Sequence, residues 1–466
     1  MGLAAPVRRF AALVALVLVA TSCGASAQLV APPAEGASST EGVALAAAVD
    51  PTPVPATPTP DAEVAPGPLI PTDTLWQAVD DNFAALDDLD VSYSFLLVSP
   101  SEGRIHGRDA KAALLPASNQ KVVTAVGALE LLDDDARFST ELWLDDDNNV
   151  YVVGGADPTF ASRHVRAFAT ALVDELGVPA SVTSTVGDVA DELAFTEIGD
   201  VVVDPSAFPA TRVGPGWPAR YIPADIGPMS GLWLDDNRHR ADRRYLDDPD
   251  QGNAELVAEI FADAGITVSG RPRVGSRPET ARMLAERRSP TVAALIDDLL
   301  ARSDNEVGEA MLRHLAAEAD LAGEIPEGKA LVHDKMAQLG VDLGDPVGDG
   351  SGLSRENRLS ASQLVRVLET SAGRDWWPVV ERGLASAGVN GTLASRLESE
   401  TTAANVRAKT GTLDDARTLS GTLRTVDDEP LFFAFLVNGE DAPLAVRAMD
   451  RIVVAFSSGT LEQLTR

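Results

Sequence analysis

The sequence predicts an α+β fold in which segments from both ends of the folded part build one domain around a large inserted module. Three observations predict it: mixed helical and strand-like patterns before residue 139, the same mixture after residue 282, and a different texture between them. The 466 residues exceed one ordinary domain, and 45% hydrophobic residues suffice for real cores. We therefore expect one domain over 73–138 and 283–466, with an inserted module at 139–282.

Residues 1–27 have the layout of an export signal, in which two arginines precede an apolar run at 10–20 that is too short to span a bilayer comfortably. Residues 19–23 resemble a bacterial lipoprotein box with Cys23 as the acylated residue, whereas 25–27 fit ordinary cleavage. We favour lipidation of Cys23, because the one cysteine of the chain directly follows the apolar run. A single cysteine also excludes an intramolecular disulfide and a thiolate metal cluster.

The next segment, 28–72, is dominated by Ala, Pro, Thr, Ser and Gly, and it cannot bury enough apolar surface to fold. We interpret it as a disordered tether, so the protein is expected outside the cytoplasm, in the cell wall or anchored on the outer face of the membrane. The formal net charge of -32, spread in short acidic clusters, argues against nucleic acid or an anionic bilayer as a partner. Membrane contact is then expected only through the lipid anchor.

The folded part begins with a helical pattern near Thr72, followed by a strand over 91–99 and a second strand after the turn at 102–103. A further helix opens at Pro116, so Ser118 lies at a helix N-terminus. Shorter strand-like runs follow, at 149–153 and 200–203. From residue 291 onward we predict helices at 291–300 and 306–317, separated by residues 303–305. Strands are expected at 405–409, 419–425 and 431–437, and a closing helix at 445–456.

Five lysines stand against thirty-three arginines, and two of them lie in short motifs. The chain reads S-x-x-K from Ser118 to Lys121, S-x-N at 303–305 and K-T-G at 409–411, in that order. A guanidinium stays protonated in proteins, whereas a desolvated ammonium loses its proton readily. A lysine retained in a chain that otherwise prefers arginine therefore indicates chemistry that needs a base.

Positions three apart share a helix face, so Ser118 and Lys121 are expected to touch. Lys121 would take the proton of the Ser118 hydroxyl, with its pKa lowered by desolvation and by Lys409 as a second cation. Ser303 would pass a proton to a leaving amine, and the Asn305 amide would bind a backbone-like group.

The K-T-G segment would bind the other end of a substrate. Lys409 and Thr410 would hold a terminal carboxylate, and Gly411 would allow close approach to the strand. The backbone amides of Ser118 and Thr412 would form an oxyanion hole. Each motif also has a plain structural interpretation, as a helix cap, a connection or a strand-end turn.

Other types of site find little support. The five histidines show no H-E-x-x-H or paired spacing, so we expect no metal and no cofactor. No serine lies in a G-x-S-x-G elbow, which disfavours an α/β-hydrolase. Residues 349–352 are glycine-rich but lack the P-loop lysine, and we interpret them as a tight loop.

Further segments make the chain from about Thr72 to its end resemble the class C low-molecular-mass penicillin-binding proteins, the D-alanyl-D-alanine carboxypeptidase/endopeptidase family. They are 116–121, 154–159, 215–217, 349–355, 390–393 and 409–412. The resemblance implies a penicillin-recognising serine transferase domain of the β-lactamase/transpeptidase type. It also implies that Ser118 attacks the D-Ala-D-Ala end of a peptidoglycan stem peptide through an acyl-enzyme, and that penicillin and other β-lactams acylate it and stay.

One feature departs from the family pattern: Asp414 and Asp415 follow the K-T-G-T-L segment, where family members usually carry small or apolar residues. Two carboxylates near Lys409 would weaken the binding of an anion unless they point to solvent. Two alternatives therefore stay open, a β-lactamase with rapid deacylation and a non-catalytic wall-associated lipoprotein whose site is a relic.

Overall fold

The computed structural model describes residues 70–176 and 197–465, all of which belong to one unit of the chain. The predicted export signal, Cys23 and nearly all of the predicted tether lie outside the described residues. Within the described ranges, no helix combines the length and the apolar character that crossing a membrane requires.

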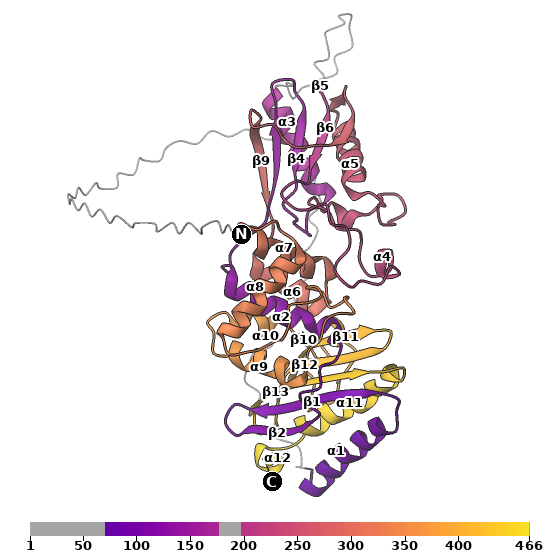
Figure 1. Ribbon diagram of the computed structural model, residues 1–466, viewed down its shortest axis with the longest axis vertical. Helices are drawn as coiled ribbons and strands as arrows, with labels where there is room; N and C mark the ends of the chain where they lie inside the picture. The colour runs from indigo at the N-terminus through magenta and orange to yellow at the C-terminus, as the bar shows by residue number, and fades with distance from the viewer. Residues whose placement is uncertain (1–69, 177–196, 466) are drawn as a thin grey trace, which may run out of the picture. The chain divides into compact units, whose positions relative to one another are not determined.

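A six-stranded antiparallel sheet joins the two ends of the described chain (Figure 1). Its central strand β13 pairs with β1 on one side and with β12 on the other, so residues more than 300 positions apart become neighbours. In spatial order the strands are β10 (Ala385–Ser386), β11 (Val406–Leu413), β12 (Ala416–Arg424), β13 (Pro430–Asn438), β1 (Ser92–Ser99) and β2 (Gly103–Arg108).

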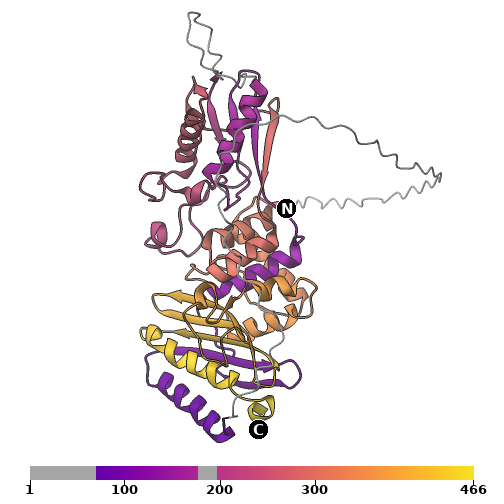
Figure 2. The ribbon, with the colours of Figure 1, turned by 180° about the vertical axis from the view of Figure 1, so that it is seen from behind.

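Both faces of this sheet are covered, which explains why β13 is an almost unbroken apolar run. Successive side chains of a strand point to opposite faces. Phe433 and Phe435 belong to the core shared with helices α1 (Thr72–Asp87) and α11 (Ala442–Ser457), which lie side by side (Figure 2). Phe432 belongs to the core on the other face.

A layer of helices packs on that other face and carries much of the candidate site. Val122 and Val126 of α2 share one core with apolar side chains of the helices around it. The elements of this layer are η1 (Ala117–Asn119), α2 (Gln120–Leu131), α6 (Val292–Asp297), η3 (Asp298–Arg302), α7 (Asn305–Glu318), α8 (Ile325–Gln338), α9 (Ala361–Ser371), α10 (Trp377–Gly383) and η4 (Gly391–Leu393).

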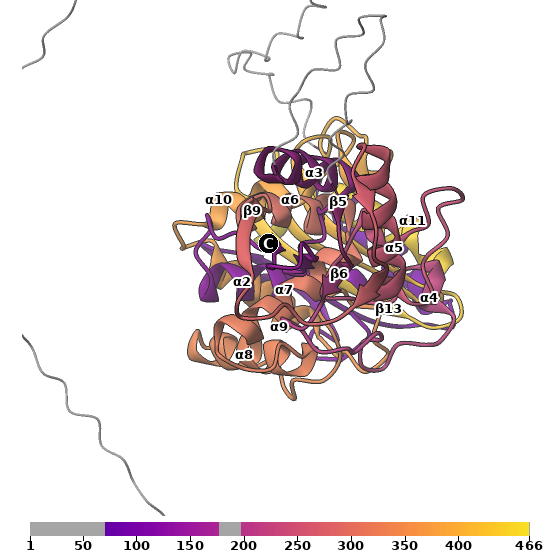
Figure 3. The same cartoon turned by 90° about the horizontal axis from the view of Figure 1, so that it is seen from above.

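A second sheet forms from the segment between β3 and β9, with its own apolar core (Figure 3). Its strands in spatial order are β8 (Pro272–Val274), β6 (Val201–Asp204), β4 (Val150–Val153), β3 (Ser139–Leu144) and β9 (Arg282–Arg288). Strands β5 (Glu197–Ile198) and β7 (Thr267–Val268) pair separately. The accompanying helices are α3 (Ser162–Leu176), α4 (Tyr221–Ala224), α5 (Pro249–Asp263) and the short turn η2 (Asp235–Asn237).

The α+β prediction is confirmed, and the predicted strands and helices of the two ends lie close to their observed bounds. Two expectations differ. Helices α3, α5, α8, α9 and α10 were not predicted, although Val165, Phe168 and Leu172 bury one helical face of α3. The strand predicted over 405–409 continues to Leu413, because β12 pairs with β11 along its whole length. The K-T-G segment therefore lies inside a strand, not in a turn at its end.

We predict that the aromatic cluster beneath α1 and α11 stabilises this arrangement strongly. Phe435 is fully buried, and its ring centroid lies 4.9 Å from that of Phe95. Phe435→Ala should lower the free energy of unfolding by about 3–5 kcal/mol, since the site cannot collapse around the lost ring. Denaturant unfolding followed by circular dichroism measures this loss. Leu444→Ala, at a side chain that is 64% exposed on α11, is the matched control and should change little.

Candidate active site

Ser118 lies in a short 3-10 turn that leads into α2, and its position is fixed from two sides. Asn119, which is fully buried, forms hydrogen bonds with Thr418 and Ser420 of β12. On the other side, a Cβ atom at Gly352 would collide with the carbonyl of Ala117, so only glycine fits there. The Ser118 side chain itself is half-buried and faces a cleft.

Lys121 is fully buried, and its amine meets three acceptors at hydrogen-bonding distance. The Nζ atom lies 3.0 Å from Ser118 Oγ, 2.7 Å from Asn305 Oδ1 and 2.6 Å from the carbonyl oxygen of Ser351. An ammonium has three protons to donate, so the charged form is fully satisfied. A neutral amine has a free lone pair, and Ser118 is the acceptor here that also carries a proton to give.

Burial lowers the pKa of Lys121 to about 8, while four nearby carboxylates oppose this shift. Burial and Lys409 were both expected to lower the pKa of Lys121. Burial is the leading cause there, as expected, and burial together with the Lys121 ammonium holds the pKa of Lys409 well below its ordinary value. Because repulsion between two ammonium groups acts on both, deprotonation of one lysine favours the charge on the other.

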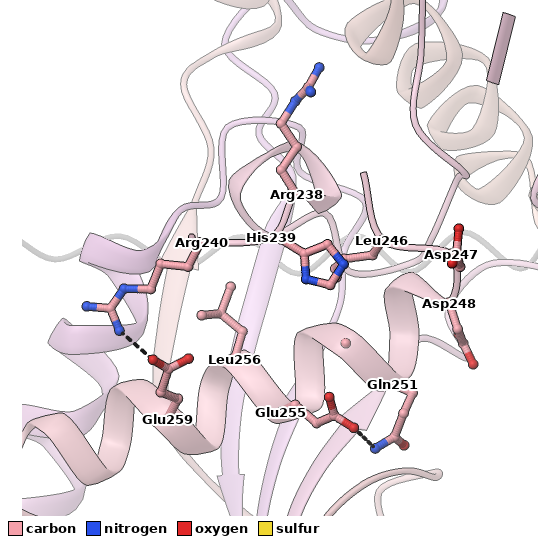
Figure 4. A pocket seen from close by; sticks show the side chains of 11 residues that line it. Arg238, His239, Arg240, Leu246, Asp247, Asp248, Gln251, Glu255, Leu256 and Glu259 are labelled. Carbon is pink, nitrogen blue, oxygen red and sulfur yellow. Dashed lines mark hydrogen bonds and ion pairs between the residues drawn. The ribbon is translucent and has the colours of Figure 1, made fainter. Parts of the chain in front are cut away.

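The cleft in front of Ser118 has a volume of about 550 Å³ and collects residues from distant parts of the chain. Of the residues predicted from the sequence, Ser118, Ser303, Asn305, Thr410 and Thr412 line it. The other residues that line it are Tyr221, Asp225, Leu353, Thr392, Leu413, Asp414 and Arg417. A separate pocket in the segment of the second sheet, lined by Arg238, Glu259 and their neighbours, contains none of the predicted residues (Figure 4).

The S-x-N segment lies between two helices, as predicted, and its backbone is unusual. Ser303 ends the π-helical turn η3 with a left-handed conformation, φ 64°. Asp304 then caps α7 by accepting a hydrogen bond from the Val307 amide at 2.9 Å. Asn305 begins α7, and its Nδ2 donates to the Asp225 carbonyl at 2.9 Å while its Oδ1 faces Lys121. The asparagine amide therefore binds protein groups on both sides.

The K-T-G strand faces the cleft with alternate residues. Lys409 is fully buried, and its Nζ donates to the Thr410 carbonyl at 2.7 Å. The Thr410 hydroxyl donates to Thr392 Oγ1 at 2.7 Å, and Thr412 is exposed. At Gly411 a Cβ atom would collide with the Thr418 hydroxyl, so packing of β11 within the protein already requires this glycine. From the sequence, we had attributed this glycine to close approach of the substrate.

Both acidic residues that follow K-T-G-T-L are paired with arginines. Asp414 forms an exposed ion pair with Arg220 at 2.6 Å. Asp415 accepts two hydrogen bonds from Arg355, each 2.6 Å long, and this guanidinium holds the pKa of Asp415 below its ordinary value. The arginines offset both negative charges, which weakens the argument that these carboxylates repel an anionic substrate.

A buried polar cluster behind Lys121 was missed at the level of the sequence. Residues 349–352 were interpreted as a tight loop, but the Asp349 carboxylate accepts hydrogen bonds from Trp217 Nε1 at 2.7 Å and from the Ser354 amide at 2.7 Å. Lys329, a third buried lysine, donates to the Asp349 carbonyl at 2.9 Å. The scarcity of lysine was the signal that could have pointed to it. In the parts of the chain that the structure covers, no group of three or more His, Cys, Asp or Glu residues is suited to a metal ion.

The comparison with known families shows which family this chain belongs to. Residues 77–242 and 239–458 match the family described as D-Ala-D-Ala carboxypeptidase 3 (S13). The chain belongs to this family. Membership confirms the resemblance found in the sequence, together with the expected activity of a serine-type D-Ala-D-Ala carboxypeptidase, which is a hydrolase.

Relatives of this S13 family member share most of its length. A D-alanyl-D-alanine carboxypeptidase of Actinomadura sp. is 28% identical over 429 residues, which cover 76% of this chain and 78% of that protein. A carboxypeptidase of Mycobacterium tuberculosis is 30% identical over 363 residues, covering 73% of this chain and 74% of that protein. The crystal structure of penicillin-binding protein 4 of Haemophilus influenzae has a TM-score of 0.69 and 21% identity, and covers 84% of this chain and 100% of that chain. This likeness confirms the penicillin-recognising fold.

Proposed function

We propose that this protein cleaves the D-Ala-D-Ala end of peptidoglycan stem peptides through an acyl-enzyme on Ser118. One observation carries the proposal: the amine of Lys121 lies 3.0 Å from Ser118 Oγ, at a cleft that is also lined by Thr410 and Thr412. A nucleophile within hydrogen-bonding reach of a base is the arrangement that acyl transfer needs. Family membership supplies the substrate class.

In the acylation step, Ser118 Oγ attacks the carbonyl of the penultimate D-alanine while its proton passes to Lys121 Nζ. The amides of Ser118 and Thr412 donate to the oxygen that becomes negative. Collapse of this intermediate breaks the peptide bond, and the leaving amine of the terminal D-alanine takes a proton by way of Ser303. Water then hydrolyses the ester on Ser118 and releases the shortened peptide.

The geometry refines two of the roles expected from the sequence. Lys409 is fully buried beneath the cleft and bonded to the Thr410 carbonyl, so it would attract the terminal carboxylate through its charge while the Thr410 hydroxyl makes the contact. Asn305 binds Lys121 through its side-chain oxygen, so its first role would be to orient the base. If the leaving amine belongs to a crosslinked peptide and not to D-alanine, the same reaction is an endopeptidase step.

Labelling with penicillin tests the nucleophile directly. The wild-type protein should form a lasting adduct with a fluorescent penicillin, and Ser118→Ala should form none, because among the described residues Ser118 carries the hydroxyl that forms a hydrogen bond with Lys121 Nζ. Mass spectrometry of the adduct and release of D-alanine from a D-Ala-D-Ala peptide are the measurements. An unlabelled wild-type protein would refute the proposal. Rapid turnover of penicillin would favour a β-lactamase, and labelling without release of D-alanine would favour the relic site.

Replacement of the base should separate proton transfer from folding. Lys121→Arg keeps a cation but not a base, so acylation should fall by at least about 100-fold while the far-ultraviolet circular dichroism stays unchanged. In the wild type, the neutral amine is the active form and burial lowers the pKa of Lys121 to about 8. The acylation rate should therefore rise as the pH increases toward about 8 and level off above it. Retained activity in Lys121→Arg would mean that another group is the base.

We also propose that the protein acts outside the cytoplasm and that a lipid on Cys23 anchors it. The support is the layout of residues 1–27, with the lipoprotein box at 19–23. The intact mass of the protein recovered from membranes of a producing cell should equal that of a chain that begins at Cys23 and carries acyl groups. A chain that begins at residue 28 without lipid would contradict the anchor and would indicate ordinary signal cleavage.

A further inference from the structure

The loop at 349–352 is held between three helices directly behind Lys121. From α2, the Thr124 hydroxyl donates to the Gly350 carbonyl at 2.8 Å, and Lys121 Nζ donates to the Ser351 carbonyl at 2.6 Å. From α8, Lys329 donates to the Asp349 carbonyl at 2.9 Å. Three successive carbonyl groups of the loop therefore accept hydrogen bonds from three side chains of the helical layer.

Helix α7 binds the backbone amides of the same loop through one carboxyl group. Glu309 is fully buried, and its Oε1 accepts a hydrogen bond from the Ser351 amide at 2.8 Å. Its Oε2 accepts from the Gly350 amide at 3.3 Å. The loop packs closely against α7 here, since a Cβ atom at Gly350 would collide with the Gly308 carbonyl.

These contacts hold the loop segment that carries the Ser351 carbonyl. The two oxygens of Glu309 bind the N–H groups of Gly350 and Ser351, directly before this carbonyl, and Asp349 Oδ1 accepts from the Gly352 amide of the carbonyl's own peptide unit at 2.8 Å. The carbonyl is one of three acceptors around Lys121 Nζ, beside Ser118 Oγ and Asn305 Oδ1. A neutral amine donates its two protons to the Asn305 and Ser351 oxygens, and its lone pair then accepts from the Ser118 O–H.

We propose that Glu309 is a positioning residue for Lys121: through the amides of Gly350 and Ser351 it holds the Ser351 carbonyl against the amine that serves Ser118. This inference rests on the proposed function, since it assigns Glu309 to the same acylation step. Glu309 does not reach the cleft, which it does not line, so it acts only through the loop.

The charge of Glu309 gives this role a distinctive signature. Burial and the Asp349 carboxylate raise the pKa of Glu309 above its ordinary value, and the two loop amides, which donate to its ionised form, oppose that shift. In turn, Glu309 is among the carboxylates that favour the ammonium form of Lys121. Removing it should lower the pKa of Lys121 further, because burial would then be less opposed. Several titratable groups surround Lys121 and the loop behind it. They are Asp304, Glu306, Glu309, Lys329, Asp349 and Lys409.

The test is the pH dependence of acylation by fluorescent penicillin in the full chain carrying Glu309→Gln. This variant keeps the shape of the side chain but replaces one acceptor by a donor that faces the Gly350 amide. We expect the plateau rate of acylation to fall about 10–100-fold, by analogy with the loss of a group that orients a metal-binding side chain. We also expect the acid limb of the profile to move to lower pH. Loss of the charge alone would move that limb and leave the plateau rate at its wild-type value.

Glu130→Gln is the matched control, since Glu130 is a carboxylate on α2 with 11% of its side chain exposed, paired with Arg374 and far from the loop contacts. Its profile should equal that of the wild type. If Glu309→Gln does not fold, Glu309→Asp keeps the charge but withdraws it by one methylene, and the rate should fall with the acid limb unmoved. Wild-type rates in either folded Glu309 variant would overturn the positioning role alone. Absence of labelling in the wild type would overturn the proposed function and this inference with it.

Discussion

Burial of the Lys121 amine is the constraint on which the rest of the site depends. In water an ammonium would hold its proton, and the serine one turn earlier would be an ordinary hydroxyl. In the protein the amine is enclosed by Ser118, Asn305 and the Ser351 carbonyl, and the loss of solvation lowers its pKa to about 8. The cost of burying an ammonium is offset by three hydrogen bonds and by carboxylates such as Asp349 and Glu309.

This enclosure explains why the fold needs segments from so many parts of the chain. The six-stranded sheet brings β11 and β12 beside the turn that carries Ser118, and Asn119 forms hydrogen bonds with Thr418 and Ser420 of β12. Helix α7 supplies Asn305 in front of the amine and Glu309 behind it. The site is therefore preorganised from the sheet side and from the helix side, which is how protein dipoles stabilise charge without rearrangement during the reaction.

The motifs and the fold class were predictable because both depend on local patterns. Helical spacing placed Ser118 and Lys121 on one face, and apolar runs placed the strands that became β1, β12 and β13. Family membership confirmed the activity that the motifs suggested. The roles of the individual site residues stay predictions, although the observed distances are those that the proposed chemistry requires. The pairing of Asp414 with Arg220 and of Asp415 with Arg355 was not predictable, because each arginine lies far from its partner in the sequence.

The sequence by itself determined the fold class, many of the helices and strands, and the order of the three motifs, and it placed Ser118 beside Lys121, because one turn of helix suffices to bring a serine and a lysine together. Only the tertiary structure decided how the base is held. The Ser351 carbonyl meets Lys121, and Glu309 and the buried Lys329 hold the loop that carries this carbonyl. These contacts span long separations in the chain, and no periodicity in the sequence encodes which backbone carbonyl meets which amine. Desolvation is likewise a property of the packed molecule, since it depends on everything that excludes water from one atom.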